Sequence, residues 1–473
     1  MDMNRREFVK GAAGMAGMMM AGCATARKES PLFAGPSLNV RGANERIRVA
    51  CVGFSDRFRY SLLPCFLDNA KELNFDIVAV ADLWKKRLNE EAIPVLKEKT
   101  GHDIKGYASD EALYAEAKDV DAVIISTADF QHAQHAAHAV NAGKDAYCEK
   151  PMAEDMYSAN MLLDAVNAKR DAGFALGAVL QIGSQRRSGP AYHAARDYIR
   201  SGKFGEIKYV DLCWNVNQPR RWRRDEKYVA SLKEEDTDWR KWLLDRPYEK
   251  FDPRKYLEFR LFWPYSSGIP GQWMCHQIDT VSWFTGIPYP TSAVASGGLY
   301  AWNDGRQSFD TFTTILEYGH PGKGFQAVFS SRQTNCERGN VEKYYSTTGT
   351  IDLIAGTASN DGVERWGMVD GKWGETSPRW EKKLTELASG GAAATAANTG
   401  ADPLTNAHMR NWMECVRARK NPNASIEAGY GHAVALIMAN AACRTGMKAT
   451  FDAAARQVMA GGKVWTGYAS TRA

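Results

Sequence analysis

The chain has 473 residues, of which 44% are hydrophobic and 24% are charged. This composition is ordinary for a globular protein and excludes a mostly disordered or fibrous one. Its 60 lysines and arginines outnumber its 55 aspartates and glutamates by only five, and no long basic block occurs, so we expect no nucleic-acid partner.

Residues 1–26 have the features of an export signal. Arg5 and Arg6 form a twin-arginine pair, followed by a mildly apolar, glycine-rich segment. This pattern resembles a bacterial Tat signal. Cys23 ends a lipobox-like segment and would carry a lipid anchor to the membrane, whereas Ala24-Thr25-Ala26 would be cut for simple release. We favour the lipoprotein, and we expect a protein in the periplasm or anchored facing it, with 27–45 as a linker.

The cysteines indicate free thiols. There are nine, and none forms a C-x-x-C pair. The Tat route exports proteins already folded, usually with a cofactor in place, so these thiols need not pair in an oxidising compartment. We therefore expect buried free thiols rather than a disulfide framework.

Strand and helix patterns alternate from residue 46 to about 180. Apolar strands are predicted at 46–53, 75–81, 121–126, 145–148 and 175–180, with helices between them. Fully apolar strands between helices are typical of a parallel sheet covered on both faces. We therefore predict an α/β N-terminal Rossmann domain, a doubly wound parallel sheet, over 46–170.

The pattern changes from about residue 205. Residues 207–214 alternate between polar and apolar side chains, as do parts of 309–317 and 324–331. This alternation predicts an α+β C-terminal domain over 171–473, with a large open, mostly antiparallel sheet. Within it, 215–265 is an insertion rich in Trp and Arg, and low-complexity 388–400 is expected to be a mobile loop. Closing helices are expected at about 404–419 and 427–445.

The turn after the first strand carries an incomplete dinucleotide fingerprint. That fingerprint has three glycines, for a tight turn, for close approach to pyrophosphate and for helix–strand packing. Here the positions hold Gly53, Ser55 and Phe58. Ser55 leaves room for a phosphate, but Phe58 is large and must displace a neighbouring group. Gly53, Ser55 and Arg57 are our candidate cofactor contacts in this turn.

Asp82 ends the second apolar strand. A carboxylate there accepts hydrogen bonds from the adenosine ribose of NAD and repels the 2′-phosphate of NADP. Lys85, Lys86 and Arg87 follow directly and would still pair with a phosphate, so NADP stays an alternative. A helix N-cap is the structural alternative for Asp82.

Two further segments carry a family resemblance. Thr127-Ala128 precedes His132 by a few residues, and Ala142-Gly143-Lys144 leads to Glu149-Lys150-Pro151. The chain thereby resembles the Gfo/Idh/MocA oxidoreductases over about 46–450, with Thr127-Ala128 in place of their T-P. The resemblance implies NAD or NADP as cofactor, contacted by Thr127, His132, Glu149 and Lys150.

Lys150 is the candidate proton acceptor. Oxidising an alcohol sends a hydride to the nicotinamide and a proton to a base. The oxidised nicotinamide is cationic, and a positive neighbour favours the neutral form of a lysine. Pro151 fixes the turn that aims this side chain. The alternative is a surface lysine in a turn.

Gln272, His276 and Asp279 share one face of a predicted helix. Family members commonly carry D-x-x-x-H-x-x-D here. The resemblance implies that His276 hydrogen-bonds the reacting hydroxyl or relays its proton, and that Asp279 positions it. Gln272 replaces the first aspartate; it can bind a hydroxyl but cannot take a proton.

Other side chains have weaker patterns. Arg186 and Arg187 follow a predicted strand and are candidates for binding substrate hydroxyls or a carboxylate, with solvated or ion-paired arginines as the alternative. The histidines at 132, 135 and 138 lack a completing carboxylate or cysteine, so we expect no metal site. Eight of the fourteen tryptophans lie within 214–302, and we expect Trp222, Trp239 or Trp263 in a sugar-binding cleft.

These observations predict an exported NAD(P)-dependent oxidoreductase acting on a sugar, glycoside or polyol. Free nicotinamide nucleotide is not expected outside the inner membrane, so the cofactor should be tightly bound and recycled in place. A redox-neutral glycosidase or epimerase of the same superfamily is one alternative. A sugar-binding protein that has lost the cofactor is another. By resemblance, the open sheet implies a homo-oligomer.

Overall fold

The computed structural model describes residues 45–173, 177–387 and 402–467. The predicted signal at 1–26, Cys23, the linker before residue 45 and the segment 388–400 lie outside these residues. None of the described helices is both long and apolar enough to cross a membrane.

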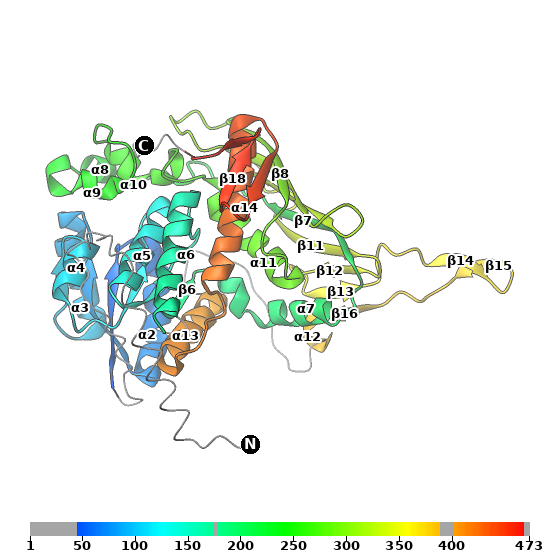
Figure 1. The fold of residues 1–473 in the computed structure, drawn as a ribbon, viewed down its shortest axis with the longest axis horizontal. Coiled ribbons are helices and arrows are strands. Elements are labelled where there is room, and N and C mark those ends of the chain that lie inside the picture. Colours follow the sequence, from blue (N-terminus) through cyan, green and yellow to red (C-terminus); the bar gives the residue numbers. More distant parts are fainter. Residues whose placement is uncertain (1–44, 174–176, 388–401, 468–473) are drawn as a thin grey trace, which may run out of the picture. The chain divides into compact units, whose positions relative to one another are not determined.

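The N-terminal sheet has six parallel strands in the order β3-β2-β1-β4-β5-β6. Its central strands are fully buried because helices cover both faces (Figure 1). The order reverses between β1 and β4, which creates the switch point where doubly wound folds bind ligands. The strands are β1 (Ile47–Val52), β2 (Phe75–Ala81), β3 (Lys105–Tyr107), β4 (Ala122–Ile125), β5 (Asp145–Cys148) and β6 (Leu180–Ile182); the helices are α2 (Leu63–Leu73), α3 (Ile93–Thr100), α4 (Asp110–Glu116), α5 (His132–Asn141) and α6 (Met156–Asp171).

This domain extends beyond the predicted boundary at 170. Strand β6 pairs with β5, and helix α13 (Pro403–Ala418) packs its Trp412 into the core beneath β1 and β2. The strand expected at 175–180 instead occupies 180–182, because Gly177 bends the chain with a φ of +75°.

The C-terminal sheet has eleven strands and confirms the predicted open sheet. Every pairing in it is antiparallel except β7 with β10. Helices α7 (Pro190–Arg200), α11 (Cys275–Thr285) and α14 (Ile426–Thr445) lie on one face (Figure 1). The strands are β7 (Ile207–Trp214), β8 (Ser292–Gly298), β9 (Thr311–Tyr318), β10 (Phe325–Arg332), β11 (Asn340–Ser346), β12 (Thr350–Asp352), β13 (Thr357–Ser359), β16 (Glu381–Lys383), β17 (Ala449–Asp452), β18 (Gln457–Ala460) and β19 (Lys463–Val464); β14 (Trp366–Val369) and β15 (Lys372–Glu375) form a separate hairpin.

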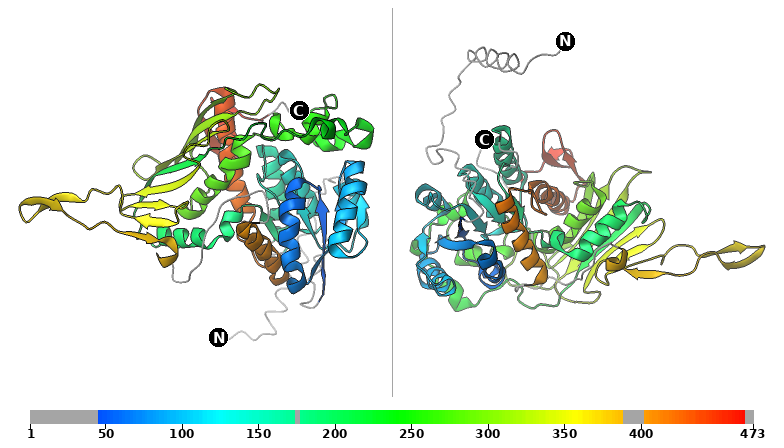
Figure 2. Two further views of the ribbon diagram at one scale, coloured as in Figure 1. Left: turned by 180° about the vertical axis from the view of Figure 1, so that it is seen from behind. Right: turned by 90° about the horizontal axis from the view of Figure 1, so that it is seen from below.

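The insertion 215–265 packs on the N-terminal domain. Its helices α8 (Glu226–Ala230), α9 (Trp239–Leu243) and α10 (Pro253–Leu257) lie over one end of that domain in Figure 1 and in the left view of Figure 2. They share a core with three residues of the N-terminal domain, Trp84, Ala128 and Phe130. The insertion is therefore a cover built onto the carboxyl ends of the parallel strands.

Phe130 anchors this cover. It is fully buried, and its ring lies edge-on to Trp242 at 5.0 Å and 5.3 Å from Tyr265. We expect Phe130→Leu to lower the free energy of unfolding by about 1–2 kcal/mol, because it loses aromatic contacts and leaves a partial cavity. Urea unfolding measures this, with the exposed Tyr248→Leu as control. A loss no larger than that of the control would show that Phe130 does not anchor the insertion.

The thiols follow the expectation only in part. Six described cysteines are buried, Cys443 is half-buried and Cys336 is exposed on the loop between β10 and β11. Burial raises the pKa of the Cys148 thiol well above its usual value. The buried thiols are therefore held in their neutral form.

Candidate active site

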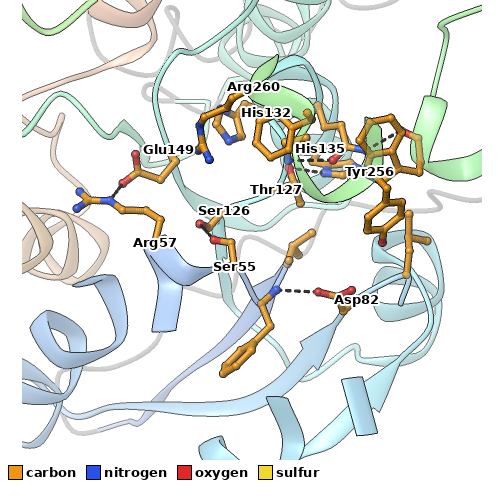
Figure 3. A pocket seen from close by; sticks show the side chains of 18 of the residues that line it. Ser55, Arg57, Asp82, Ser126, Thr127, His132, His135, Glu149, Tyr256 and Arg260 are labelled. Atoms are coloured by element: carbon orange, nitrogen blue, oxygen red, sulfur yellow. Dashed lines mark hydrogen bonds and ion pairs between the residues drawn. The ribbon is translucent and has the colours of Figure 1, made fainter. Parts of the chain in front are cut away.

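A cavity of about 1010 Å³ opens at the switch point of the N-terminal sheet. It is lined by the turn after β1, the ends of β2, β4 and β5, the insertion, and the helical turn Pro270–Met274 that leads into α11. Its volume lies at the upper end of the range for ligand pockets. Figure 3 shows Asp82 on one side of this cavity and Arg260 beside His132 on another.

The turn after β1 is built for close approach of a ligand. Gly53 has a φ of +83°, and a Cβ there would lie 2.7 Å from Thr127 Cγ2. The hydroxyls of Ser55 and Ser126 hydrogen-bond at 2.6 Å across the switch point (Figure 3). Phe58 is buried against Phe54 and does not line the cavity. The missing third glycine therefore does not obstruct the site.

Asp82 joins two turns at the cavity wall. Its carboxylate accepts hydrogen bonds from Phe54 N at 3.0 Å and Trp84 N at 2.9 Å, and Arg87 lies 3.5 Å away. The contact with Trp84 N closes a turn and does not cap the following helix, which has no side-chain cap, so the capping alternative is wrong and Asp82 lies at the cavity. Its charge and place fit a ribose, and the cradle at Gly53 fits a dinucleotide.

Glu149 connects the glycine turn to Lys150. Arg57 Nε donates to Glu149 Oε1 at 2.9 Å, and Lys150 N donates to Oε2 at 3.1 Å. Burial alone would raise the pKa of Glu149, but Arg57 and Lys150 lower it below its usual value. Glu149 is thus an anion that fixes the Lys150 backbone, while Lys150 Nζ donates to the Gln272 carbonyl at 3.1 Å.

The histidines of α5 have separate partners. His132 Nδ1 donates to the Pro151 carbonyl at 2.9 Å, which fixes the turn after Lys150. His135 hydrogen-bonds Thr127 at 3.1 Å, and His138 pairs with Asp110 at 2.8 Å. Asp110 is a carboxylate that the sequence pattern did not connect to this helix. Within the residues that the structure describes, no cluster suited to a metal ion occurs.

His276 lines the same cavity as Lys150. Its ring is buried and lies 5.7 Å from that of Trp214. Burial, followed by the charges of Lys150 and Arg186, lowers the pKa of His276 well below its usual value. The imidazole is therefore neutral at physiological pH and able to accept or donate a hydrogen bond.

Three predicted site residues lie outside the cavity lining. Arg187 Nε donates to Asp279 Oδ2 at 2.8 Å, and Arg186 pairs with Glu342 in a second buried ion pair. The structure therefore favours the ion-paired alternative for both arginines. Asp279 lies next to Arg187 and His432 rather than in the cavity, because it is one further turn along α11 from His276.

The tryptophans also differ from expectation. Trp222 lines the cavity, but Trp239 is in the shared core and Trp263 packs beneath Arg444. Trp214, Trp242 and Trp273 line the cavity as well. Burial pattern in an irregular insertion is not readable from sequence, so the correct tryptophans could not be selected.

Gln272 has a fixed orientation through residues that the sequence analysis missed. Its Nε2 donates to the buried Asp129, and its Oε1 accepts from Arg260 Nε at 2.9 Å. Asp129 follows Thr127-Ala128 directly, so its proximity to the motif was the available signal. Arg260 comes from the insertion, where no sequence signal marked it as a site residue. Together these contacts hold the Gln272 carbonyl that receives Lys150.

A second buried carboxylate lies behind this network. Glu154 Oε1 accepts from Ser267 Oγ at 3.1 Å, whereas Oε2 has no hydrogen-bond partner among the described residues. Burial, and then the charge of Asp129, raises the pKa of Glu154 well above its usual value. The folded protein therefore keeps the Glu154 carboxyl protonated at pH values where the same group in the unfolded chain has lost its proton.

This difference gives a pH-dependent stability. The unfolded chain ionises near pH 4.3, so above that pH the folded state binds more protons, and stability falls until the folded pKa is passed. We expect Glu154→Gln to become increasingly more stable than the wild type from about pH 5 to about pH 8. Thermal melts at both pH values measure this, with the exposed Glu98→Gln as control. An equal difference in stability between Glu154→Gln and the wild type at about pH 5 and about pH 8 would contradict this prediction.

The fold and the cavity define a two-domain protein with a dinucleotide-type cleft. Residues 47–175 match the model of the oxidoreductase family with an NAD-binding Rossmann fold. The N-terminal part of the chain is thus similar to the NAD-binding domain of the Gfo/Idh/MocA oxidoreductases.

Known proteins agree with this assignment. The chain is 29% identical to an inositol 2-dehydrogenase of Agrobacterium fabrum over 193 residues, 38% of this chain and 52% of that protein. It spans about half the length of the first curated relatives it matches. The WlbA dehydrogenase from Bordetella pertussis, solved with NADH and UDP-GlcNAcA, has a TM-score of 0.59 at 16% identity, covering 87% of this chain and 99% of that one. For aldose-aldose oxidoreductase from Caulobacter crescentus the TM-score is 0.57 at 16% identity, with 86% and 100% covered. Both matches show that this chain shares the fold of these two proteins.

Proposed function

We propose that this protein is an NAD-dependent oxidoreductase acting on a hydroxyl of a sugar, glycoside or polyol. The observation that carries the proposal is the meeting of Lys150 and His276 in one cavity with the glycine turn and Asp82. The inositol dehydrogenase relative acts on a polyol by name, which agrees with this substrate class.

Different residues of the chain bind the cofactor, accept the substrate proton and orient the substrate. Gly53, Ser55, Asp82 and Thr127 would hold NAD, which supplies a hydride acceptor when bound. Lys150 Nζ accepts the proton of the substrate hydroxyl, while the neutral His276 hydrogen-bonds that hydroxyl and orients it. Glu149 and the Gln272 carbonyl fix the lysine from two sides, so its position is set before substrate binds.

We also propose that the cofactor is resident and that the protein is exported. Export rests on the twin-arginine pattern at 1–26, with Cys23 as the proposed lipid attachment site. Residence is supported by the insertion, because it is tied to the N-terminal domain where Arg224 pairs with Asp56 and Gln131 donates to the Trp242 carbonyl at 2.6 Å. A covered cofactor has to be recycled in place.

Resident NAD leaves two reaction classes. One reduces a second substrate; the other oxidises a hydroxyl, eliminates or epimerises at the neighbouring carbon and reduces again. Incubating the NAD-loaded protein with a labelled glycoside separates them. Cleavage without a second substrate identifies the redox-neutral reaction, and a stoichiometric burst of ketone identifies oxidoreduction. No ketone, no epimer and no cleavage, with NAD bound, would contradict the proposed function.

The open sheet supports a homo-oligomer. Its face opposite α7, α11 and α14 carries the exposed Tyr209 and Val294. Self-association through this face would bury them. Light scattering tests this part of the proposal, and a monomer at micromolar concentration would contradict it.

A further inference from the structure

The insertion brings Arg221 to the cavity without a carboxylate partner among the described residues. Arg220 lies 3.7 Å from Glu226, Arg223 donates to Glu258 at 3.0 Å, and Arg224 pairs with Asp56. Arg221 lines the cavity but has no carboxylate partner within the described parts of the chain. Its Nη1 donates to the Gln218 side chain, but its buried Nε has no hydrogen-bond partner there. A guanidinium in this state favours an anionic ligand.

Other cations gather around Arg221. The charge of Arg260 lowers its pKa, after the larger effect of burial, so the two guanidinium groups lie close enough to repel each other. Arg260 Nε donates to the Gln272 side chain, and Lys150 Nζ donates to the carbonyl of the same residue. Asp129 lies 3.6 Å from Arg260, and the charge of Glu149 acts on Lys150, so of these three cations it is Arg221 that has no carboxylate partner among the described residues.

Aromatic side chains form the adjoining wall. The Arg221 guanidinium lies 5.7 Å from the ring of Trp273. That ring contacts Trp222 at 5.6 Å and Trp214 at 6.2 Å, and Trp214 contacts His276. Indole faces pack against the C–H groups of a sugar ring. The cation cluster therefore lies beside both the proposed reacting hydroxyl and a surface suited to a saccharide.

We propose that the substrate is a carboxylate-bearing sugar whose carboxylate is bound by Arg221 and Arg260 of the insertion. This deepens the proposed function and rests on it. A planar carboxylate accepts two parallel hydrogen bonds from a guanidinium, which gives the unpaired Nε of Arg221 an acceptor and offsets the repulsion between the two arginines. A neutral sugar leaves Arg221 without a carboxylate partner. The insertion therefore selects the substrate as well as covering the cavity.

The test compares matched acidic and neutral sugars by calorimetry on the NAD-loaded protein. The probes are glucuronate with glucose, galacturonate with galactose, and the methyl glycosides of each. We expect at least one acid to bind at least about tenfold more tightly than its neutral partner, and to weaken as salt rises. Equal affinities throughout the panel, or no binding by any acid, would overturn the proposal.

Three variants locate the effect. We expect Arg221→Gln to abolish the preference for the acid, Arg221→Lys to keep part of it, and Arg220→Gln, whose side chain is exposed and outside the cavity lining, to keep all of it. The NAD content of each purified variant is measured alongside. Loss of NAD from Arg221→Gln would mean that Arg221 binds a cofactor phosphate, and would overturn the proposal while leaving the proposed function intact. If the wild type itself holds no NAD, it is the proposed function that fails.

Discussion

Replacing Lys150 by alanine is expected to lower the rate of hydroxyl oxidation by about 10²- to 10⁴-fold, the range of a lost general base. The cofactor should stay bound, because Glu149, which anchors this turn through the Lys150 backbone, is held independently by Arg57. Single-turnover formation of NADH, followed by its fluorescence, measures the rate, and mass spectrometry of the denatured protein measures the retained NAD.

Lys150→Arg is the matched control for charge. It keeps a cation able to donate to the Gln272 carbonyl, but an arginine does not give up its proton at accessible pH. We expect it to be nearly as slow as Lys150→Ala. Wild-type rates in Lys150→Arg would mean that Lys150 supplies charge rather than proton transfer, and wild-type rates in both variants would remove it from the mechanism.

Gly53→Ala is expected to weaken NAD binding at least about 30-fold. An alanine at this positive φ costs about 1–2 kcal/mol. Its Cβ would also lie 2.7 Å from Thr127 Cγ2 and 3.0 Å from the Ser126 carbonyl, an overlap worth about 1–3 kcal/mol. Relief requires the turn after β1 to move away from β4, which opens the switch point. Titration of the apoprotein with NADH measures the affinity.

Gly101→Ala separates strain from overlap. Gly101 has a similar φ of +80°, at the end of α3, but a Cβ there meets nothing within 4 Å. We expect this control to lose a little stability in thermal melts and to bind NADH as the wild type does. Unchanged NADH affinity in Gly53→Ala would show that the turn does not contact the cofactor.

The N-terminal domain was predictable because its signals are local. The apolar runs at 47–52 and 75–81 and the Ala-rich helix after His132 each contain their own pattern. The family resemblance drawn from Glu149-Lys150-Pro151 and the parallel sheet are both confirmed. The edge strand β6 was misplaced, because three residues of strand after a glycine bend give almost no periodic pattern.

The arginines show where local reasoning fails. Arg186 and Arg187 were candidates for binding substrate because they follow a strand, but their partners Glu342 and Asp279 lie 156 and 92 residues away in sequence. Whether an arginine is compensated depends on such distant pairs. For the same reason Arg221 and Arg260 could not be distinguished from their neighbours in a segment without periodicity. Long-range charge pairing thus requires the three-dimensional structure.

The most direct test of the account is the nucleotide that the folded protein carries. The full chain is expressed with its signal, purified from the cell envelope, denatured, and its supernatant analysed by mass spectrometry. The account predicts close to one NAD per chain, and NAD rather than NADP because of Asp82. A protein that is empty, and that also fails to take up added NAD, would contradict it and favour a sugar-binding protein without redox chemistry.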